Sequence, residues 1–169
     1  EMSASLVGSE MCIRDRVSPQ VRADITRWVA EQTGNVLDFQ FRGDSPAQPI
    51  PQYQITALPE GYVETERTTN DWITHVEYTC ADKNWITFSY VYMQDGASTG
   101  FSLSDGDKVQ NVTVGNLPGK LILAQDPEVK NALIWIDSAQ NLQFSIIADV
   151  DESVIIAMAE SISLFDPTK

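Results

Sequence analysis

Few residues of this sequence could do chemistry, and a lone histidine is the first to weigh. His75 is the sole histidine among the 169 residues, so the chain can build neither a two-histidine metal site nor a Ser-His-Asp set with a spare base. It lies in an alternating segment that places it on one strand face with Ile73 and Glu77. A surface position with a cross-strand hydrogen bond is therefore favoured for His75 over catalysis.

Two short motifs look like ligand-binding loops but lack the required spacing. An EF-hand loop needs further oxygen ligands beyond Asp105-Gly106-Asp107 and a glutamate at its twelfth position, and SDGDKVQNVTVG has neither. Asp-Gly between two strand-like segments is instead typical of a tight hairpin. The stretch from Gly115 to Lys120 (GNLPGK) lacks the spacing of a phosphate-binding loop and precedes no long helix, so a turn is favoured.

The acidic side chains and Cys80 provide no reactive constellation either. Carboxylates are plentiful, but no spacing singles out two of them as a general acid and a general base. Cys80 ends an apolar segment, where a buried inert thiol is favoured over a nucleophile. We therefore expect no catalytic, metal-binding or cofactor-binding residue, and we expect that the protein is not an enzyme.

A set of aromatic side chains is the remaining candidate for a ligand-binding site, because a ligand could stack on a face of aromatic rings. Core packing is favoured over ligand stacking for these residues. The ligand-binding residues therefore stay unassigned at this point. The set comprises Trp72, Tyr78, Trp85, Tyr90, Tyr92 and Trp135.

The first predicted unit, over residues 17–43, is a helix followed by a strand. Ser18 is a good N-cap, Val21, Ile25 and Trp28 fall on one helical face, and Gly34 is a typical helix end. The strand has its apolar side chains on one face, and a proline-rich loop over residues 44–52 then leads to the main body. These apolar strand residues are Leu37, Phe39 and Phe41.

From Tyr53 onward, apolar and polar residues alternate along nearly every segment, which is typical of β-strands. Short loops rich in turn-forming residues separate the segments, and such short connections force neighbouring strands to run antiparallel. The sequence thus predicts an antiparallel β-meander within residues 53–165. The predicted strands are QYQIT, YVETERT, ITHVEYTC, WITFSYVYM, GFSLS, KVQNVTV, KLILAQ, ALIWID and LQFSIIAD.

The segment WITFSYVYM, residues 85–93, has apolar side chains on both faces. Ile86 and Phe88 lie on one face, and Trp85 and Val91 lie on the other. A strand of this kind belongs at the centre of a sheet that is covered on both sides. A C-terminal helix can cover one face, and the opposite face needs the N-terminal helix, a partner or a ligand.

The last predicted element is that C-terminal helix. Asp149 and Glu152 have the spacing of a capping box. An apolar stripe is formed by Val154, Ile155, Met158 and Ile162, with Ala159 beside it. The predicted fold class is therefore α+β: an antiparallel meander sheet covered by a C-terminal helix and preceded by an N-terminal helix. Residues 166–169 are expected to be a tail.

The opening residues are identified as a sequencing artefact. Residues 6–16 (LVGSEMCIRDR) resemble the translation of a transposase sequencing adapter. We therefore expect residues 1–16 to be non-native and disordered, with Cys12 not a native thiol and the gene cut near Val17. Any signal peptide or membrane helix would then lie in the lost upstream part.

The native part is strongly acidic. Residues 1–16 carry two basic and three acidic side chains, so 9 basic and 21 acidic residues remain, a net charge of −12. This charge repels nucleic-acid phosphates, and no basic cluster offsets it, so a nucleic-acid partner is disfavoured. The remaining residues are enough for one domain with its own core.

Several short motifs resemble one uncharacterised family. They are LPEGY (58–62), VGNLPGKLI (114–122), ALIWID followed by LQFSI, and AESIS (159–163). The family consists of strand-rich domains of Gram-positive clostridia. The resemblance implies an extracytoplasmic domain on the cell-surface side of the membrane, tethered by one transmembrane helix and found in anti-sigma-factor-like proteins. It implies no catalytic residues.

Two functions remain open from the sequence. The first is a non-catalytic extracytoplasmic sensor or binding domain of a membrane-anchored protein, which regulates an anti-sigma-type system through an unknown protein partner or apolar ligand. The alternative is a carrier or chaperone that binds lipidated or apolar cargo in a cavity between sheet and helices.

Overall fold

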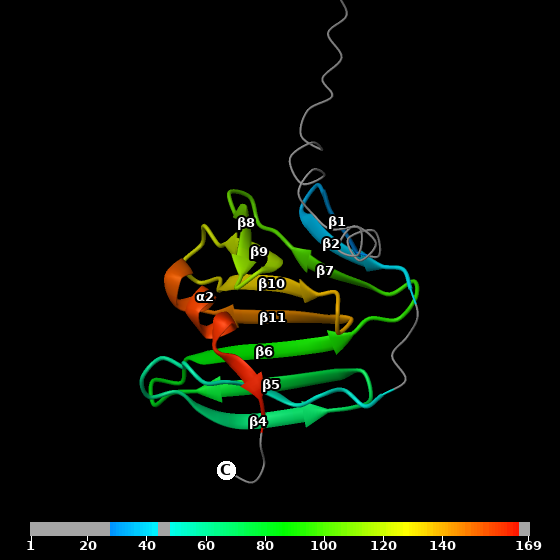
Figure 1. Cartoon of the computed structure of the whole chain (residues 1–169). Coiled ribbons are helices and arrows are strands. Elements are labelled where there is room, and N and C mark those ends of the chain that lie inside the picture. The colour runs from blue at the N-terminus through cyan, green and yellow to red at the C-terminus, as the bar shows by residue number, and fades with distance from the viewer. Residues whose placement is uncertain (1–27, 44–47, 166–169) are drawn as a thin grey trace, which may run out of the picture.

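The computed structural model describes residues 28–43 and 48–165 (Figure 1). The predicted adapter at residues 1–16, the first part of the predicted helix and the tail at 166–169 lie outside these ranges. The described elements are β1 (Trp28–Thr33), β2 (Val36–Phe41), β3 (Tyr53–Ile55), β4 (Val63–Thr69), β5 (Ile73–Thr79), β6 (Trp85–Tyr92), β7 (Ser98–Ser102), β8 (Lys108–Val114), β9 (Leu117–Leu123), β10 (Asn131–Asp137), β11 (Leu142–Ala148), α2 (Glu152–Glu160) and β12 (Ile162–Leu164).

A seven-stranded sheet forms the main body, and all its pairings are antiparallel, as predicted. Its strand order is β4-β5-β6-β11-β10-β9-β8. The prediction of one continuous meander is wrong, because β7 leaves this sheet and β6 pairs with β11 instead. β6 and β11 are apolar on both faces and therefore need the central positions, whereas β7 has a single large apolar side chain, Phe101.

β7 joins a second sheet with the order β1-β2-β7, and the buried side chains of this smaller sheet pack on one face of the large one. Leu37, Phe39 and Phe41 of β2 are each at most 2% exposed and form one core cluster with Ile134 and Ile136 of β10. Each phenylalanine buried in this way stabilises the fold by about 1.5–3 kcal/mol. The face that the sequence left without an assigned cover is thus covered mainly by β2 and β7.

The predicted N-terminal helix is wrong over its last six residues, Trp28–Thr33, which form β1. Gly34 adopts a φ of 57° and, with Asn35, connects β1 to β2 in a two-residue turn between the paired residues Thr33 and Val36. A left-handed glycine serves a hairpin as well as a helix end, so the local signal was ambiguous. Pairing with β2 decides the conformation, and tertiary contacts outweigh the weak helix propensity.

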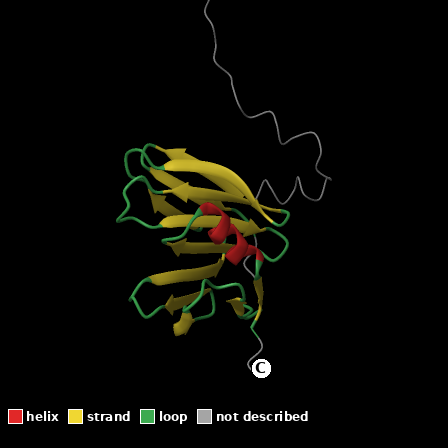
Figure 2. Cartoon of the chain, turned by 90° about the vertical axis from the view of Figure 1, so that its left-hand side faces the viewer, coloured by secondary structure: helices red, strands yellow, loops and turns green. Residues whose placement is uncertain are grey.

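The other face of the large sheet is covered by α2 and by a two-stranded unit of β3 and β12. Figure 2 shows α2 lying against the strands rather than within their layer. Ile155, Met158 and Ala159 of α2 are buried, as the helical stripe predicted. The structure differs at both helix ends: Asp151 is the N-cap without a side-chain hydrogen bond, and Ile162 starts β12.

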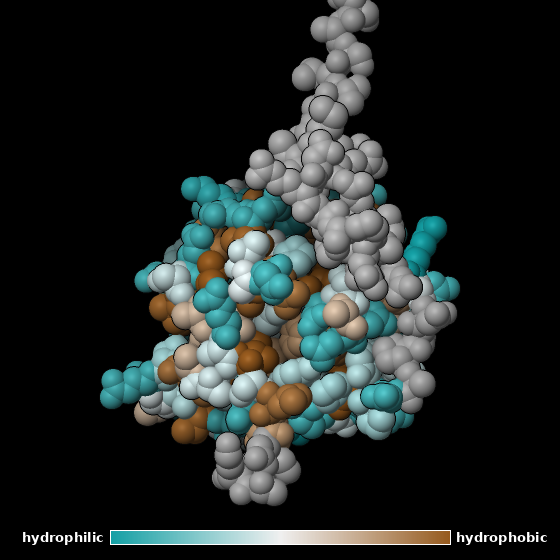
Figure 3. Space-filling view, viewed as in Figure 1, coloured by the Kyte–Doolittle hydropathy of each residue, from teal (hydrophilic) through white to brown (hydrophobic). Residues whose placement is uncertain are grey.

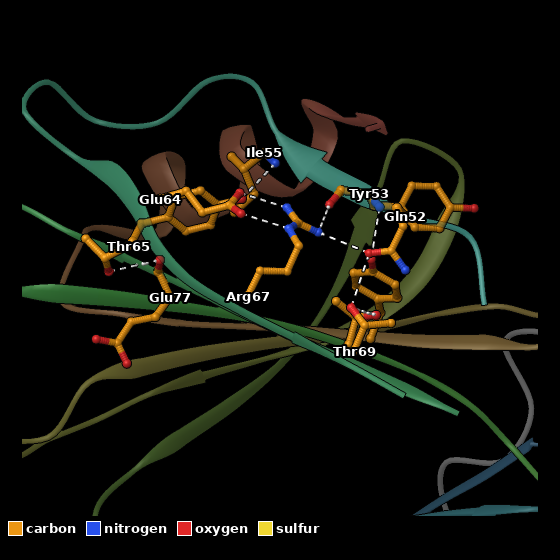
Figure 4. A network of polar contacts seen from close by, with 11 residues as sticks. Gln52, Tyr53, Ile55, Glu64, Thr65, Arg67, Thr69 and Glu77 are labelled. Carbon is orange, nitrogen blue, oxygen red and sulfur yellow. Dashed lines mark hydrogen bonds and ion pairs between the residues drawn. The ribbon is translucent and has the colours of Figure 1, made fainter. Parts of the chain in front are cut away.

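The inner edge of β3 is held by side chains instead of a neighbouring strand. The backbone N–H groups of Tyr53 and Ile55 donate to the hydroxyl oxygens of Tyr90 and Tyr78, at 2.9 and 3.3 Å. Arg67 Nη1 donates to the carbonyl oxygen of Tyr53 at 3.0 Å (Figure 4). A buried backbone without partners would cost free energy, so these three side chains allow β3 to lie over the core.

A β-bulge in β4 makes this arrangement possible. The register with β5 shifts between Glu64 and Glu66, so that Glu64 opposite Tyr78 and Arg67 opposite Val76 face the same side. Glu64 then accepts two hydrogen bonds of 2.8 Å from the guanidinium of Arg67 (Figure 4). These bonds raise the pKa of Arg67 above its usual value and fix the side chain that binds β3.

We predict that Tyr78→Phe and Tyr90→Phe each lower the free energy of unfolding by about 1–3 kcal/mol, because each leaves a buried N–H of β3 without its acceptor. Tyr92→Phe is the matched control, since this side chain is also largely buried but no hydrogen bond of its hydroxyl is found among the described residues. Urea unfolding measures the change. Equal stability of all three variants would contradict the anchoring role of the two hydroxyls.

Candidate ligand-binding site

The structure places His75 where the sequence predicted it. The side chain is exposed on β5, and its Nδ1 lies 2.9 Å from Ser89 Oγ on the neighbouring strand β6. Cys80 follows β5 as a free, half-buried thiol. Among the described residues, neither side chain is brought together with a set of groups that would activate a nucleophile.

Asp105 and Asp107 lie in a turn between the two sheets, so the predicted tight hairpin is wrong: β7 and β8 do not pair. Gly106 adopts a φ of 93°, which explains the Asp-Gly signal. Asp107 accepts hydrogen bonds from the backbone N–H groups of Ser104 and Gln125 and thereby fixes the turn. Over residues 28–43 and 48–165, no group of three side chains has a metal-binding arrangement.

The aromatic candidates divide into core and surface residues. Tyr78, Tyr90, Tyr92 and Trp135 are buried, and the Trp135 and Phe144 rings stack at 5.2 Å. Two tryptophans reach the surface, Trp72 at 40% and Trp85 at 39% exposed. The ammonium of Lys130 lies 4.4 Å from the ring centre of Trp85. Core packing therefore accounts for most of the set. The two exposed tryptophans lie at opposite ends of the paired strands β5 and β6.

A hollow with a volume of about 530 Å³ lies between the two sheets. This volume falls in the range typical of small-molecule sites. We call it the inter-sheet hollow. Its lining residues are Ala30 of β1, Phe39 of β2, Asn111, Val112 and Thr113 of β8, Pro118, Gly119 and Lys120 of β9, and Ile136 of β10.

The hollow opens where β9 separates from β10. The ladder between these strands ends at the Gly119–Trp135 pair, and the next residue, Pro118, has no N–H to continue it. On the opposite side, Ala30 pairs with Phe39 and so occupies a position of β1 that faces the large sheet. Its small side chain leaves the space above β8 and β9 unfilled.

Gly119 is required at this place by the close approach of two strands. A Cβ atom there would lie 2.9 Å from the carbonyl oxygen of Ile134 and 3.1 Å from the Cβ of Trp135. Backbone cannot move aside as a flexible side chain can, so a larger residue would push β9 away from β10. The glycine thus fixes the floor of the inter-sheet hollow.

Lys120 supplies the charge of the inter-sheet hollow. Its Nζ donates a hydrogen bond to Asn111 Oδ1 on the paired strand β8. Within the described ranges Lys120 takes part in no ion pair, and the one ion pair found there joins Arg67 and Glu64. An ammonium with a neutral partner, at the rim of an apolar space, can accept an anionic group from a ligand.

A second hollow of about 290 Å³ lies at the C-terminal end of α2, against Tyr53, Trp135 and Phe144. Figure 3 shows hydrophobic residues reaching the surface between hydrophilic ones on the face that carries α2. The Tyr53 hydroxyl donates to Gln140 Oε1 at 2.7 Å. Burial, and then the nearby Asp137, raise the pKa of Tyr53, so this hydroxyl stays protonated.

Sequence reasoning missed the inter-sheet hollow. It assigned GNLPG to a turn and started the next strand at Lys120. The turn is correct for Gly115 and Asn116, but β9 already starts at Leu117, and Pro118, Gly119 and Lys120 line the hollow. A proline and a glycine inside an apolar strand pattern are the signal that could have indicated a disturbed ladder.

Comparison with known families identifies one match. The profile of a domain of unknown function, DUF4367, matches residues 52–162, about two thirds of the chain. The chain belongs to the DUF4367 family. The matched part contains the seven-stranded sheet, β7 and α2, whereas β1 and β2 precede it. No curated protein and no solved structure matches the chain.

Within the described residues of this DUF4367 protein, no helix is long and apolar enough to span a membrane.

We predict that Gly119→Ala lowers the unfolding free energy by about 1–3 kcal/mol, because the added methyl group meets the Ile134 carbonyl. Gly100→Ala in β7 is the matched control: its added Cβ would meet Val36 at an ordinary 3.5 Å. Thermal unfolding of both variants measures the difference. If the two variants lose equal stability, the close approach of β9 and β10 is wrong.

Proposed function

We propose that this DUF4367 protein is a non-catalytic binding domain of an extracytoplasmic, membrane-anchored bacterial protein. The inter-sheet hollow is the observation that carries the proposal. It combines an apolar lining with the ammonium of Lys120, in a chain whose net charge is −13. A ligand that suits this combination has an apolar body and one anionic group.

The proposed role is sensing rather than chemistry. An amphipathic ligand in the hollow would contact β1 and β2 on one side and β8 and β9 on the other. It would therefore stabilise the packing of the small sheet on the large one by mass action. This ligand-dependent change in the packing of the two sheets is a signal that a partner protein in an anti-sigma-type system could recognise.

A carrier of lipidated or apolar cargo is the second candidate. It needs a cavity lined by the central strands under α2. Within the described chain that space holds a packed aromatic cluster, with Phe88 and Trp135 on either side of Phe144, and the 290 Å³ hollow lies only at the end of the helix. This hollow has room for only part of an acyl chain, so we place the carrier function behind the first.

Binding of decanoate and of neutral decanol, measured by isothermal titration calorimetry, tests the proposed ligand class. We predict that both bind and that Ala30→Trp abolishes both, because the indole fills the hollow. Lys120→Gln should weaken decanoate roughly fivefold, about 1 kcal/mol, and leave decanol unchanged. Ala157→Trp, on the exposed side of α2, is the control. Binding that Ala30→Trp leaves intact would exclude the inter-sheet hollow as the site.

The proposed location has its own test in the intact gene. We predict that a library prepared without transposase shows, upstream of the codon for Val17, a segment that encodes one transmembrane helix of about 20 apolar residues. A long-read genome in which residues 1–16 are encoded natively, with no such helix upstream, would contradict both the adapter assignment and the membrane anchor.

A further inference from the structure

The free edge of β7 is a second feature that neither the fold nor the proposed ligand site explains. β7 pairs with β2 on one side only. Phe41 N–H donates to Ala97 and Leu103 N–H donates to Asn35, so by alternation the Thr99 and Phe101 backbone groups face β2. The backbone groups of Ser98, Gly100 and Ser102 therefore face away from it, and no backbone partner for them is found in the described ranges.

This edge lacks the features that protect other edges of the protein. β4 carries the bulge and the charged side chains of Glu64 and Arg67, β1 carries Glu31, and β8 starts with Lys108. β7 has the sequence Ser-Thr-Gly-Phe-Ser, without charge, proline or bulge. Natural sheets usually block exposed edges, and an unblocked edge is a template for another strand.

The surface beside the β7 edge is hollowed and partly apolar. The small sheet covers the large sheet as far as β11, where Thr99 Oγ1 of β7 donates to Gln143 Oε1. Beyond it, Ile73 and Trp85 of the uncovered strands are 41% and 39% exposed. Two hollows follow the edge and share Phe101: one of about 390 Å³ next to Trp85, and one of about 100 Å³ next to Ile73.

The smaller hollow contains an unsatisfied hydrogen-bonding group. Gln143 lines it and is 3% exposed, and within the described chain its Nε2 has no hydrogen-bond partner. A buried amide donor without an acceptor costs about 1–3 kcal/mol. Ser89 and Ser145 line the same hollow, so the space is prepared for a small polar group.

We propose that the free edge of β7 binds an extended peptide segment of a partner protein as an additional strand. The segment pairs with Ser98, Gly100 and Ser102, and its alternate side chains enter the two hollows. An apolar side chain fills the hollow next to Trp85, and a serine or threonine accepts the hydrogen bond of Gln143. Two acidic residues, Asp107 and Glu128, and one basic residue, Lys130, line the larger hollow in an acidic protein, so the segment is basic at its ends.

The existing fold supports strand addition as the binding mode. β2 already pairs with β7 from outside the DUF4367 match, as one antiparallel strand whose Phe39 and Phe41 insert into the core. A peptide strand on the opposite side of β7 would extend the small sheet over β6. It would then cover Ile73, Trp85 and Val91, three apolar residues of that face.

A fluorescein-labelled peptide with the sequence KTVTLTVK tests the proposal by fluorescence anisotropy against the whole protein. We expect saturable binding, and no binding of the same peptide with alternate backbone amides N-methylated, because these cannot pair with an edge. Gly100→Pro removes a free-edge N–H and should weaken binding at least tenfold. Gln32→Pro, which removes an N–H from the opposite edge of the small sheet, should leave it unchanged.

Gln143→Met keeps the test decisive if Gly100→Pro does not fold. It removes the unsatisfied donor together with the acceptor of the Thr99 hydroxyl, so the two effects on stability oppose each other and stability should change little, while peptide affinity falls severalfold. Absence of binding at millimolar peptide would overturn the proposal, and so would equal binding of the N-methylated peptide. These outcomes are independent of the inter-sheet hollow, which decanoate binding reports separately.

Discussion

A sheet whose central strands are apolar on both faces must be covered twice, and the rest of the structure follows from this constraint. β6 and β11 present Phe88 and Phe144 to one side and contribute Val91 and Ile147 to the core of the other. The first side is closed by α2 with β3 and β12, the second by the small sheet of β1, β2 and β7. Both covers are short relative to a seven-stranded sheet, and the hollows lie where a cover ends.

The two covers are attached in different ways. The small sheet is held by burial, since three large side chains of β2 enter the core. β3 also buries Tyr53 and Ile55 in the core, but the inner edge of its backbone depends on polar anchors, with Tyr78, Tyr90 and Arg67 in the place of a neighbouring strand. The β4 bulge that aims Arg67 also twists that edge away from pairing, so one local irregularity serves two purposes.

Much of this fold could be predicted from particular residues. The alternation of Ile86, Phe88 and Tyr90 with Trp85 and Val91 identified the central strand, and the stripe of Ile155 and Met158 identified α2. β1 could not be predicted, because Gly34 fits a helix end and a hairpin equally. The path of β7 into the other sheet also lacks a local signal, since a short turn does not state which sheet each strand joins.

The candidate sites were harder to predict than the fold. The inter-sheet hollow depends on Ala30 lying opposite β8 and β9, a pairing of segments about 80 residues apart that no motif encodes. The unsatisfied amide of Gln143 likewise exists only because β7 lies over β11. Sequence patterns report which side chains are buried, whereas these sites depend on where burial is incomplete.

The double covering is tested most directly by nuclear Overhauser effects between the rings of Phe39 or Phe41 and the methyl groups of Ile134 or Ile136. The account predicts strong contacts between these groups, together with a strand-like backbone for Val29 to Thr33. Phenylalanine rings with the chemical shifts of solvent-exposed residues, and a helical backbone over Val29 to Thr33, would contradict it.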